Sequence, residues 1–379
     1  MLRNVLVVVL LVLPCATAFA QTQLSMPYPK PVYNQSYPLA EARFKCPDLP
    51  TTAPRDLVFT GIYSKDDPER DDTNYDNQQE YRRQTQGIVQ FENKLLAMTN
   101  AYYVAPPDRQ AARARCALSW MYSWAGGRAL LGTTNYVGIS VRHWTLASLA
   151  SAYGQIRDEP TLDASMASEV KTWLRALALA VVADYDSPSN RRENNLAYWA
   201  AWSVTMTGVA INDFSLYQWG LRRAILAIDD IAGDGTLPLE MQRGSKAMLY
   251  HQFALTPLVM IAAAAEANGY NLYSLNDGRL DRLAKRVLAG LESPLFFESR
   301  TGYAQEGSET LSAGHMAWVE IYNAHAPSYR TRNLLQRYKP MVSRRLGGNM
   351  TLLIGGNSAA DTDAESDIKI LAPAGAEGQ

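Results

Sequence analysis

The chain has 379 residues, which is enough for one large domain or two. Its formal net charge of −1, with 19% charged residues, gives no global basic field, so we expect no nucleic-acid partner. Its four histidines form neither an HExxH pattern nor a Cys/His cluster, and the sequence contains no GxSxG and no GxxxxGK[ST]. These features argue against a metal hydrolase, and the site must be sought among other residue types.

The first twenty residues predict an export signal. Arg3 provides a short basic start, an apolar run extends from Val5 to Leu13, and an Ala-x-Ala pattern ends at Ala20. The apolar run is too short to span a bilayer. We therefore expect residues 1–20 to be a signal peptide, with cleavage after Ala20. The mature protein is then expected to be periplasmic or secreted and not bound to the membrane.

Two cysteines, Cys46 and Cys116, remain after this cleavage. An oxidising compartment favours a disulfide between them. The bridge would close a loop of about 70 residues, for which the chain-entropy model gives roughly 4 kcal/mol. Two free buried thiols are the alternative.

Two stretches before the helical region are irregular in pattern. Residues 21–56 are rich in proline and polar residues and predict a wrapped, irregular segment. Residues 64–83 are very polar, with charges of both signs, and predict an exposed flexible loop that serves as a linker or a lid.

From about residue 86 onward, apolar residues recur at helical spacing. Glycine and proline punctuate the pattern, and only "MTLLIGG" at 350–356 alternates like a strand. We predict an all-α fold of successive amphipathic hairpins, whose spacing suggests a ring of helices, although periodicity alone does not separate a toroid from a bundle. The tail 359–379 is acidic and is expected to be disordered. The helical segments are 113–131, 141–153, 167–185, 196–211, 216–231, 245–269 and 278–291.

Two residues in "RGSKAMLYH", 243–251, suggest proton-transfer chemistry. On a continuous helix, Arg243 and Tyr250 would lie within about 20° of the same face and roughly 10 Å apart along the axis. A neighbouring guanidinium favours the phenolate form of tyrosine. Such a phenolate can remove a weakly acidic C–H proton and return it to a leaving oxygen. The alternative is that Arg243 caps a helix and Tyr250 belongs to the core.

A doubled asparagine opens the apolar helix that starts near residue 196. Asparagine is a poor helix former, and one of Asn194 and Asn195 is explained as an N-cap. The second amide is then left to donate to a carboxylate and to stabilise an enolate. Asn, Arg and Tyr together are suited to β-elimination in a uronic acid polymer. The chain's eight Trp and twenty-one Tyr include candidates for stacking on sugar rings, although core packing explains most of them.

At these residues the chain resembles the periplasmic alginate lyases of polysaccharide lyase family 5. The motifs occur in the family's order: "CPDLP", "LVFT", "RCALSWMYSWA", "NNLAYWAAWSV", "LPLEMQRGSKAMLYHQFALTPLVMIAA", "AWVEIY" and "RRLGG". The resemblance implies an incomplete α/α toroid over residues 21–358. It also implies β-elimination of poly-mannuronate without a metal or cofactor, and we expect an acidic polysaccharide as the partner of a monomer.

The resemblance also implies roles for individual residues. Asn195 would neutralise the uronate carboxylate, Arg243 would assist it, and Tyr250 would be the catalytic acid and base, under a mobile lid at about 61–83. We expect the further substrate contacts to come from Asn194, Tyr198, Trp199, Tyr63, Lys65, His251, Glu320, Tyr322 and Arg345.

The chain departs from the family pattern at two positions. Leu196 stands where the family has a histidine, and Ile62 stands at the family's lid lysine, with Lys65 three residues on. The histidine is the natural base when the C5 proton lies opposite the leaving group, as in guluronate. Its loss leaves a syn elimination on D-mannuronate or D-glucuronate, where one tyrosine could serve both steps.

Three alternatives to the poly-mannuronate lyase remain open. The first is a weakened or inactive polyuronate-binding relative, because a leucine cannot take over the histidine's role. The second is a lyase for a different exopolysaccharide. The third is a hydrolase with paired carboxylates, for example Asp229 or Asp230 with Glu240.

Overall fold

The computed structural model describes residues 23–29, 44–50, 53–63, 74–187, 193–307 and 311–355. The expected signal peptide and the acidic tail lie outside these residues.

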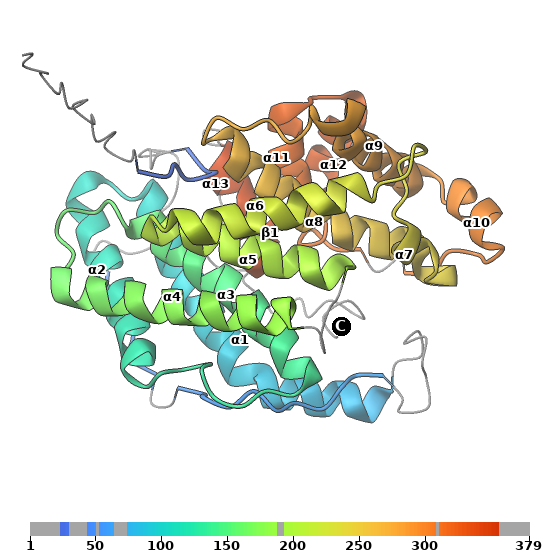
Figure 1. Ribbon diagram of the computed structural model, residues 1–379. Coiled ribbons are helices and arrows are strands. Elements are labelled where there is room, and N and C mark those ends of the chain that lie inside the picture. The colour runs from blue at the N-terminus through green and yellow to red at the C-terminus, as the bar shows by residue number, and fades with distance from the viewer. Residues whose placement is uncertain are drawn as a thin grey trace, which may run out of the picture.

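The described residues form successive pairs of helices, each packed against its partner. The pairs are α1 (Tyr75–Val104) with α2 (Pro107–Gly126), α3 (Tyr136–Ile156) with α4 (Ala164–Asp186), α5 (Asn195–Ile211) with α6 (Phe214–Asp229), α8 (Ala247–Glu266) with α9 (Arg279–Glu292), and α11 (Trp318–His325) with α12 (Tyr329–Tyr338). Figure 1 shows α1 and α3 on the lower side, α11 and α12 on the upper side, and α5 and α8 between them.

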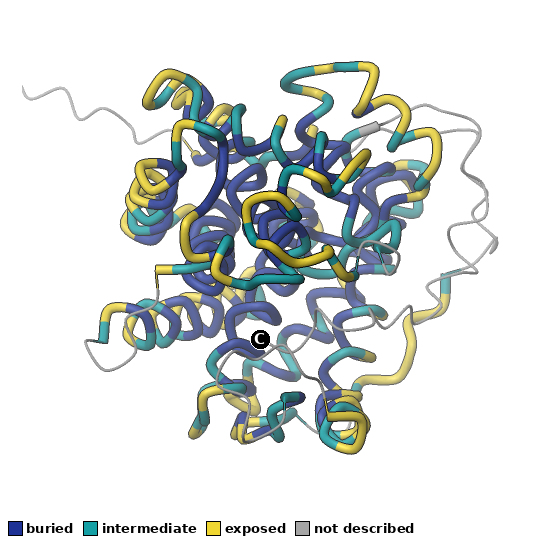
Figure 2. Tube along the Cα trace, turned by 90° about the vertical axis from the view of Figure 1, so that its right-hand side faces the viewer, coloured by how far each residue is buried: buried dark blue, intermediate teal, exposed yellow. Residues whose placement is uncertain are grey.

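The first helix of each pair lines an inner ring. Contacts run from α1 to α3, then to α5, α8 and α11, and the short helix α13 (Met350–Gly355) contacts both α11 and α1. Helices α3, α5 and α8 are buried almost all round, whereas α4, α6 and α9 bury one stripe. Figure 2 shows the buried segments gathered inside the molecule and the exposed ones at its rim. The fold is the predicted all-α, incomplete α/α toroid.

The remaining elements are short. They are α7 (Pro238–Met241), η2 (Gly244–Lys246), η3 (Leu275–Asp277), α10 (Leu295–Thr301), β1 (Val342–Ser343), η5 (Arg344–Leu346) and β2 (Gly348–Asn349). Strands β1 and β2 pair antiparallel. The segment from α7 to η2 matters most, since it connects α6 to α8 and carries Arg243.

The periodic segments are confirmed as helices α2 to α6, α8 and α9, but two local predictions are wrong. Residues 75–83 belong to α1 and not to a loop, because the Asn74 side chain caps the helix by accepting from Asn77 N at 3.0 Å. Glu80 and Arg83 then pair at 2.6 Å along its exposed face. "MTLLIGG" contributes the helix α13, whose first turn is capped by Asn349 Oδ1, which accepts from Leu352 N at 3.0 Å.

The described part of the N-terminal segment is irregular and wraps the ring, as predicted. Leu24 N donates to Asn212 Oδ1 at 2.8 Å, and Ser25 N donates to Asn268 Oδ1 at 2.8 Å. These contacts tie the segment to the ends of α5 and α8, so backbone groups that no helix satisfies find side-chain partners.

The structure contains the predicted disulfide. Cys46 and Cys116 are bonded, with a Cα–Cα distance of 5.7 Å across a sequence separation of 70. The bridge fastens the irregular segment to α2.

Replacing both cysteines should lower stability substantially. We expect the Cys46→Ala/Cys116→Ala double variant to lose roughly 4 kcal/mol of unfolding free energy, because its unfolded chain is no longer cross-linked. Urea denaturation of the oxidised wild type and the variant measures this loss. Reduced wild type is the control and should resemble the variant, while coincident midpoints for all three would show that the bridge contributes nothing.

Candidate active site

Helix α5 begins at the doubled asparagine, and the two amides have different tasks. Asn194 is the N-cap and accepts from Leu196 N at 3.2 Å, as predicted for one of the pair. Asn195 is completely buried, and its backbone N–H donates to Glu240 Oε1 at 2.9 Å. Its side-chain Nδ2 lies 3.1 Å from both oxygens of that carboxylate. The second amide is therefore held by a protein carboxylate.

Glu240 is the residue of this group that the sequence analysis missed. It lies in α7, is completely buried, and was considered only as part of a hydrolase pair. Asp229 instead accepts from Asn276 at the surface, which argues against a pair of Asp229 with Glu240. Burial raises the pKa of the Glu240 carboxyl, against the opposing effects of the Asn195 hydrogen bonds and the Arg243 guanidinium.

Arg243 and Tyr250 meet as predicted, but not on one continuous helix. Arg243 precedes η2, while Tyr250 lies in α8. Gly244 turns the chain between them with φ of +55°, a left-handed conformation that suits glycine. The Arg243 guanidinium carbon lies 4.7 Å from the centroid of the Tyr250 ring. A turn thus brings together two residues that a straight helix would have spaced along its axis.

The Tyr250 hydroxyl lies in an enclosed position. Tyr250 is 5% exposed, and its hydroxyl is 3.3 Å from the hydroxyl of Tyr63. Burial raises the pKa of Tyr250 well above 10, and the Arg243 guanidinium opposes this only in part. The Arg243 guanidinium favours the phenolate, as expected, but desolvation outweighs it. The phenol is neutral in this conformation.

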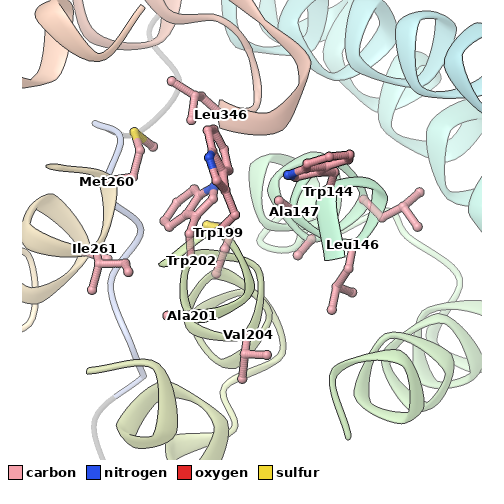
Figure 3. Packing of buried hydrophobic residues seen from close by; sticks show 14 of the residues in the cluster. Trp144, Leu146, Ala147, Trp199, Ala201, Trp202, Val204, Met260, Ile261 and Leu346 are labelled. Carbon is pink, nitrogen blue, oxygen red and sulfur yellow. The ribbon is translucent and has the colours of Figure 1, made fainter. Parts of the chain in front are cut away.

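A cluster of aromatic side chains adjoins this group. Trp199 lies one turn along α5 from Asn195, and its ring centroid is 5.2 Å from that of Phe253, which lies one turn along α8 from Tyr250. Arg345 stacks on Trp144 at 3.8 Å and lies 5.6 Å from the Trp199 ring. Figure 3 shows Trp144 and Trp199 extending toward the segment that carries Leu346. Trp144 and Phe253 of this cluster were not predicted from the sequence.

Comparison with known proteins matches this geometry to one family. The alginate lyase family profile matches residues 59–297. An alginate lyase of Pseudomonas aeruginosa is 35% identical over 315 residues, which cover 81% of this chain and 84% of the relative. The chain belongs to the alginate lyase family. A second family member, the alginate lyase of Azotobacter vinelandii, is 34% identical over 81% of this chain and 83% of its own length.

Solved structures of alginate lyases share the fold. Alginate lyase A1-III from Sphingomonas species A1 superposes with a TM-score of 0.71 at 26% identity, over 82% of this chain and 87% of that one. A histidine-to-alanine variant of A1-III in complex with a tetrasaccharide gives 0.73 at 25% identity, over 83% and 88%. These matches support a polysaccharide lyase over the inactive, binding-only alternative.

The structure brings together four of the alginate lyase site residues named from the sequence, Tyr63, Asn195, Arg243 and Tyr250, with Trp199 and Arg345 in the adjoining aromatic cluster. Asn194 caps the start of α5. Tyr198 is buried beside Glu240, and its hydroxyl donates to the Glu193 carbonyl at 3.2 Å. Lys65 lies outside the described residues.

Both ring nitrogens of His251, which was predicted to contact substrate, bond to backbone groups in this structure. The side chain is completely buried, Nε2 accepts from Leu237 N at 2.8 Å, and Nδ1 therefore donates to the Ala247 carbonyl at 2.7 Å. Burial lowers its pKa to about 4. His251 is a neutral imidazole that holds α7 against α8.

Two predicted contacts on α11 also have structural roles instead. Glu320 is buried and accepts from Thr351 Oγ1 at 2.6 Å, with Lys339 Nζ at 3.6 Å. Tyr322 is buried and donates to Asp281 of α9. These bonds join α11 to its neighbours.

Proposed function

We propose that this lyase cleaves a D-mannuronate polymer by β-elimination at the group formed by Tyr250, Arg243 and Asn195. The observation that carries the proposal is the setting of Tyr250: the Arg243 guanidinium lies 4.7 Å from the centroid of its ring, and the Tyr63 hydroxyl lies 3.3 Å from its hydroxyl. A cation and a proton-transfer group in a dry site are what elimination next to a carboxylate needs.

The chemistry divides between these side chains. Arg243 and the Asn195 amide offset the charge that the carboxylate group acquires when C5 loses its proton. Tyr250 takes that proton as phenolate, the C4–O bond breaks as the C4–C5 double bond forms, and the phenol returns a proton to the leaving oxygen. Because the resting phenol is neutral, its own proton must first move. That proton passes to solvent, and Tyr63, which is half-buried and whose hydroxyl is 3.3 Å away, is placed to relay it.

Two variants of one relative support the assignment of the tyrosine. A1-III has been solved with a tetrasaccharide in a histidine-to-alanine variant and in a tyrosine-to-phenylalanine variant. The two substituted positions are separated by the same number of residues as Leu196 and Tyr250 here. This spacing supports a sugar site at the start of α5 beside Tyr250, with the histidine replaced by leucine in this chain.

The proposal also covers the compartment and the working form of the protein. The signal ending at Ala20 would export one domain, residues 21–358, that works on an acidic polysaccharide in the periplasm as a monomer. The Cys46–Cys116 bridge supports an oxidising compartment.

A panel of polyuronates tests the proposed function. Purified protein is incubated with mannuronate-rich alginate, guluronate-rich alginate and a polyglucuronate, and the unsaturated product is followed by ultraviolet absorbance. We expect product from the mannuronate-rich polymer. Binding to a polyuronate without any product would show that the protein binds polyuronates and is not a lyase.

Mass spectrometry of the exported protein should show a mature chain that begins at Gln21.

A further inference from the structure

The Asn195 side chain directs its NH2 group toward Glu240. Nδ2 lies 3.1 Å from both carboxylate oxygens, whereas Oδ1 is buried without a hydrogen-bond partner among the described residues. A buried acceptor without a partner costs free energy. The orientation also suits a uronate poorly, because the substrate carboxylate can only accept hydrogen bonds and needs the donor end.

A proton on Glu240 would remove both difficulties. A protonated carboxyl group has one O–H donor, which can bond to Oδ1 once the Asn195 amide has turned over. The other carboxyl oxygen can keep the bond from Asn195 N, which is 2.9 Å long. Nδ2 is then released, and its two N–H groups become available to a substrate carboxylate.

We propose that Glu240 is a positioning residue that sets the orientation of the Asn195 amide, and that the enzyme takes up its uronate with Glu240 protonated. This inference rests on the proposed function, because it needs a substrate carboxylate at Asn195. Glu240 itself does not touch the substrate.

The charges around Glu240 are compatible with a protonated carboxyl group. Arg243 is the cation beside it, while Tyr198 of α5 and Tyr250 of α8 face it with hydroxyls whose own pKa values burial raises well above 10. The pKa of Glu240 is raised by burial in spite of Arg243. A uronate carboxylate would add a second negative charge and raise it further. Glu240 is therefore protonated below its raised pKa and loses the proton as the pH rises through it.

Glu240→Gln tests the inference, because glutamine fixes the arrangement of the protonated acid. Its carbonyl can accept from Asn195 N while its NH2 donates to Oδ1. We expect the ratio of kcat/KM, variant over wild type, to rise by about tenfold per pH unit above the pKa of Glu240, since only the wild type ionises. Glu240→Ala, which keeps neither bond, should lose about 10²-fold in kcat. Both are measured on mannuronate-rich alginate over a pH series.

The matched control is Glu159→Gln. Glu159 is 9% exposed and accepts hydrogen bonds from Thr161, far along the chain from α7. The ratio of kcat/KM for Glu159→Gln over that for wild type should not change with pH. A flat or falling ratio for folded Glu240→Gln overturns the inference while leaving the lyase intact. If the wild type neither cleaves nor binds any polyuronate, the proposed function fails and the inference fails with it.

A second measurement does not depend on the folding of a Glu240 variant. A mannuronate oligomer is bound to the Tyr250→Phe protein, which keeps Glu240, in buffers of different ionisation enthalpy. Calorimetry then counts the protons exchanged. We expect an uptake that approaches one proton per site as the pH rises. Binding without uptake at every pH would show that Glu240 keeps its charge and would overturn the inference.

Discussion

Tyr250→Phe should lower turnover of mannuronate-rich alginate by about 10³- to 10⁴-fold, toward the upper end of the range for acid–base catalysis. The Tyr250 phenol must transfer both protons, because Leu196 at the start of α5 has no proton-transfer group. The change removes only the hydroxyl oxygen, which contacts the Tyr63 hydroxyl, so the core should keep its packing. Initial rates from ultraviolet absorbance, together with thermal unfolding, measure activity and fold separately.

Tyr217→Phe is the matched control. Tyr217 is completely buried, in α6, and its hydroxyl has no hydrogen-bond partner in the part of the chain that the structure describes. Its removal should leave turnover unchanged. Near-normal turnover in Tyr250→Phe would place the proton transfer on another residue, and Tyr63 would be the first candidate.

The helices could be predicted where the apolar pattern was strong. Segments such as 141–153 and 196–211 are apolar at helical spacing because α3 and α5 are buried inside the ring. The start of α1 could not be found this way, because residues 75–80 face solvent and carry no apolar period. There the helix depends on the Asn74 cap, which resembles a turn signal when read from sequence alone.

The sequence allowed the residue types of the site to be predicted, but it predicted their arrangement in space less well. The proximity of Arg243 and Tyr250 was correct for the wrong reason, since a glycine turn and not a helix face brings them together. His251 follows Tyr250 directly, yet adjacent residues on a helix point about 100° apart, and His251 faces α7 instead. Glu240 was missed as a partner of Asn195 because the contact joins α7 to α5 and depends on tertiary packing.

Selectivity for D-mannuronate over guluronate is the second large effect expected, and it depends on Leu196. Leu196 is 2% exposed in the first turn of α5, directly after Asn195. It has no titratable group, so only the tyrosine side of the sugar carries a base. In mannuronate the C5 proton and the leaving oxygen lie on the same side, and in guluronate they do not. We expect wild type to cleave mannuronate blocks at least about 10²-fold faster, the typical lower value of a general base.

Leu196→His should reduce this selectivity by supplying the second base. Burial lowers the pKa of an imidazole, so the new side chain is neutral and able to accept a proton at pH 7. We expect guluronate cleavage to rise by about 10²-fold, with mannuronate rates raised less. Burying a polar ring in place of leucine should cost about 1–3 kcal/mol of stability, so assays belong well below the melting temperature. Leu196→Met is the control, because it keeps volume without a base and should retain wild-type selectivity. Efficient cleavage of guluronate blocks by the wild type would contradict the stereochemical argument, since no group at position 196 could then account for the second face.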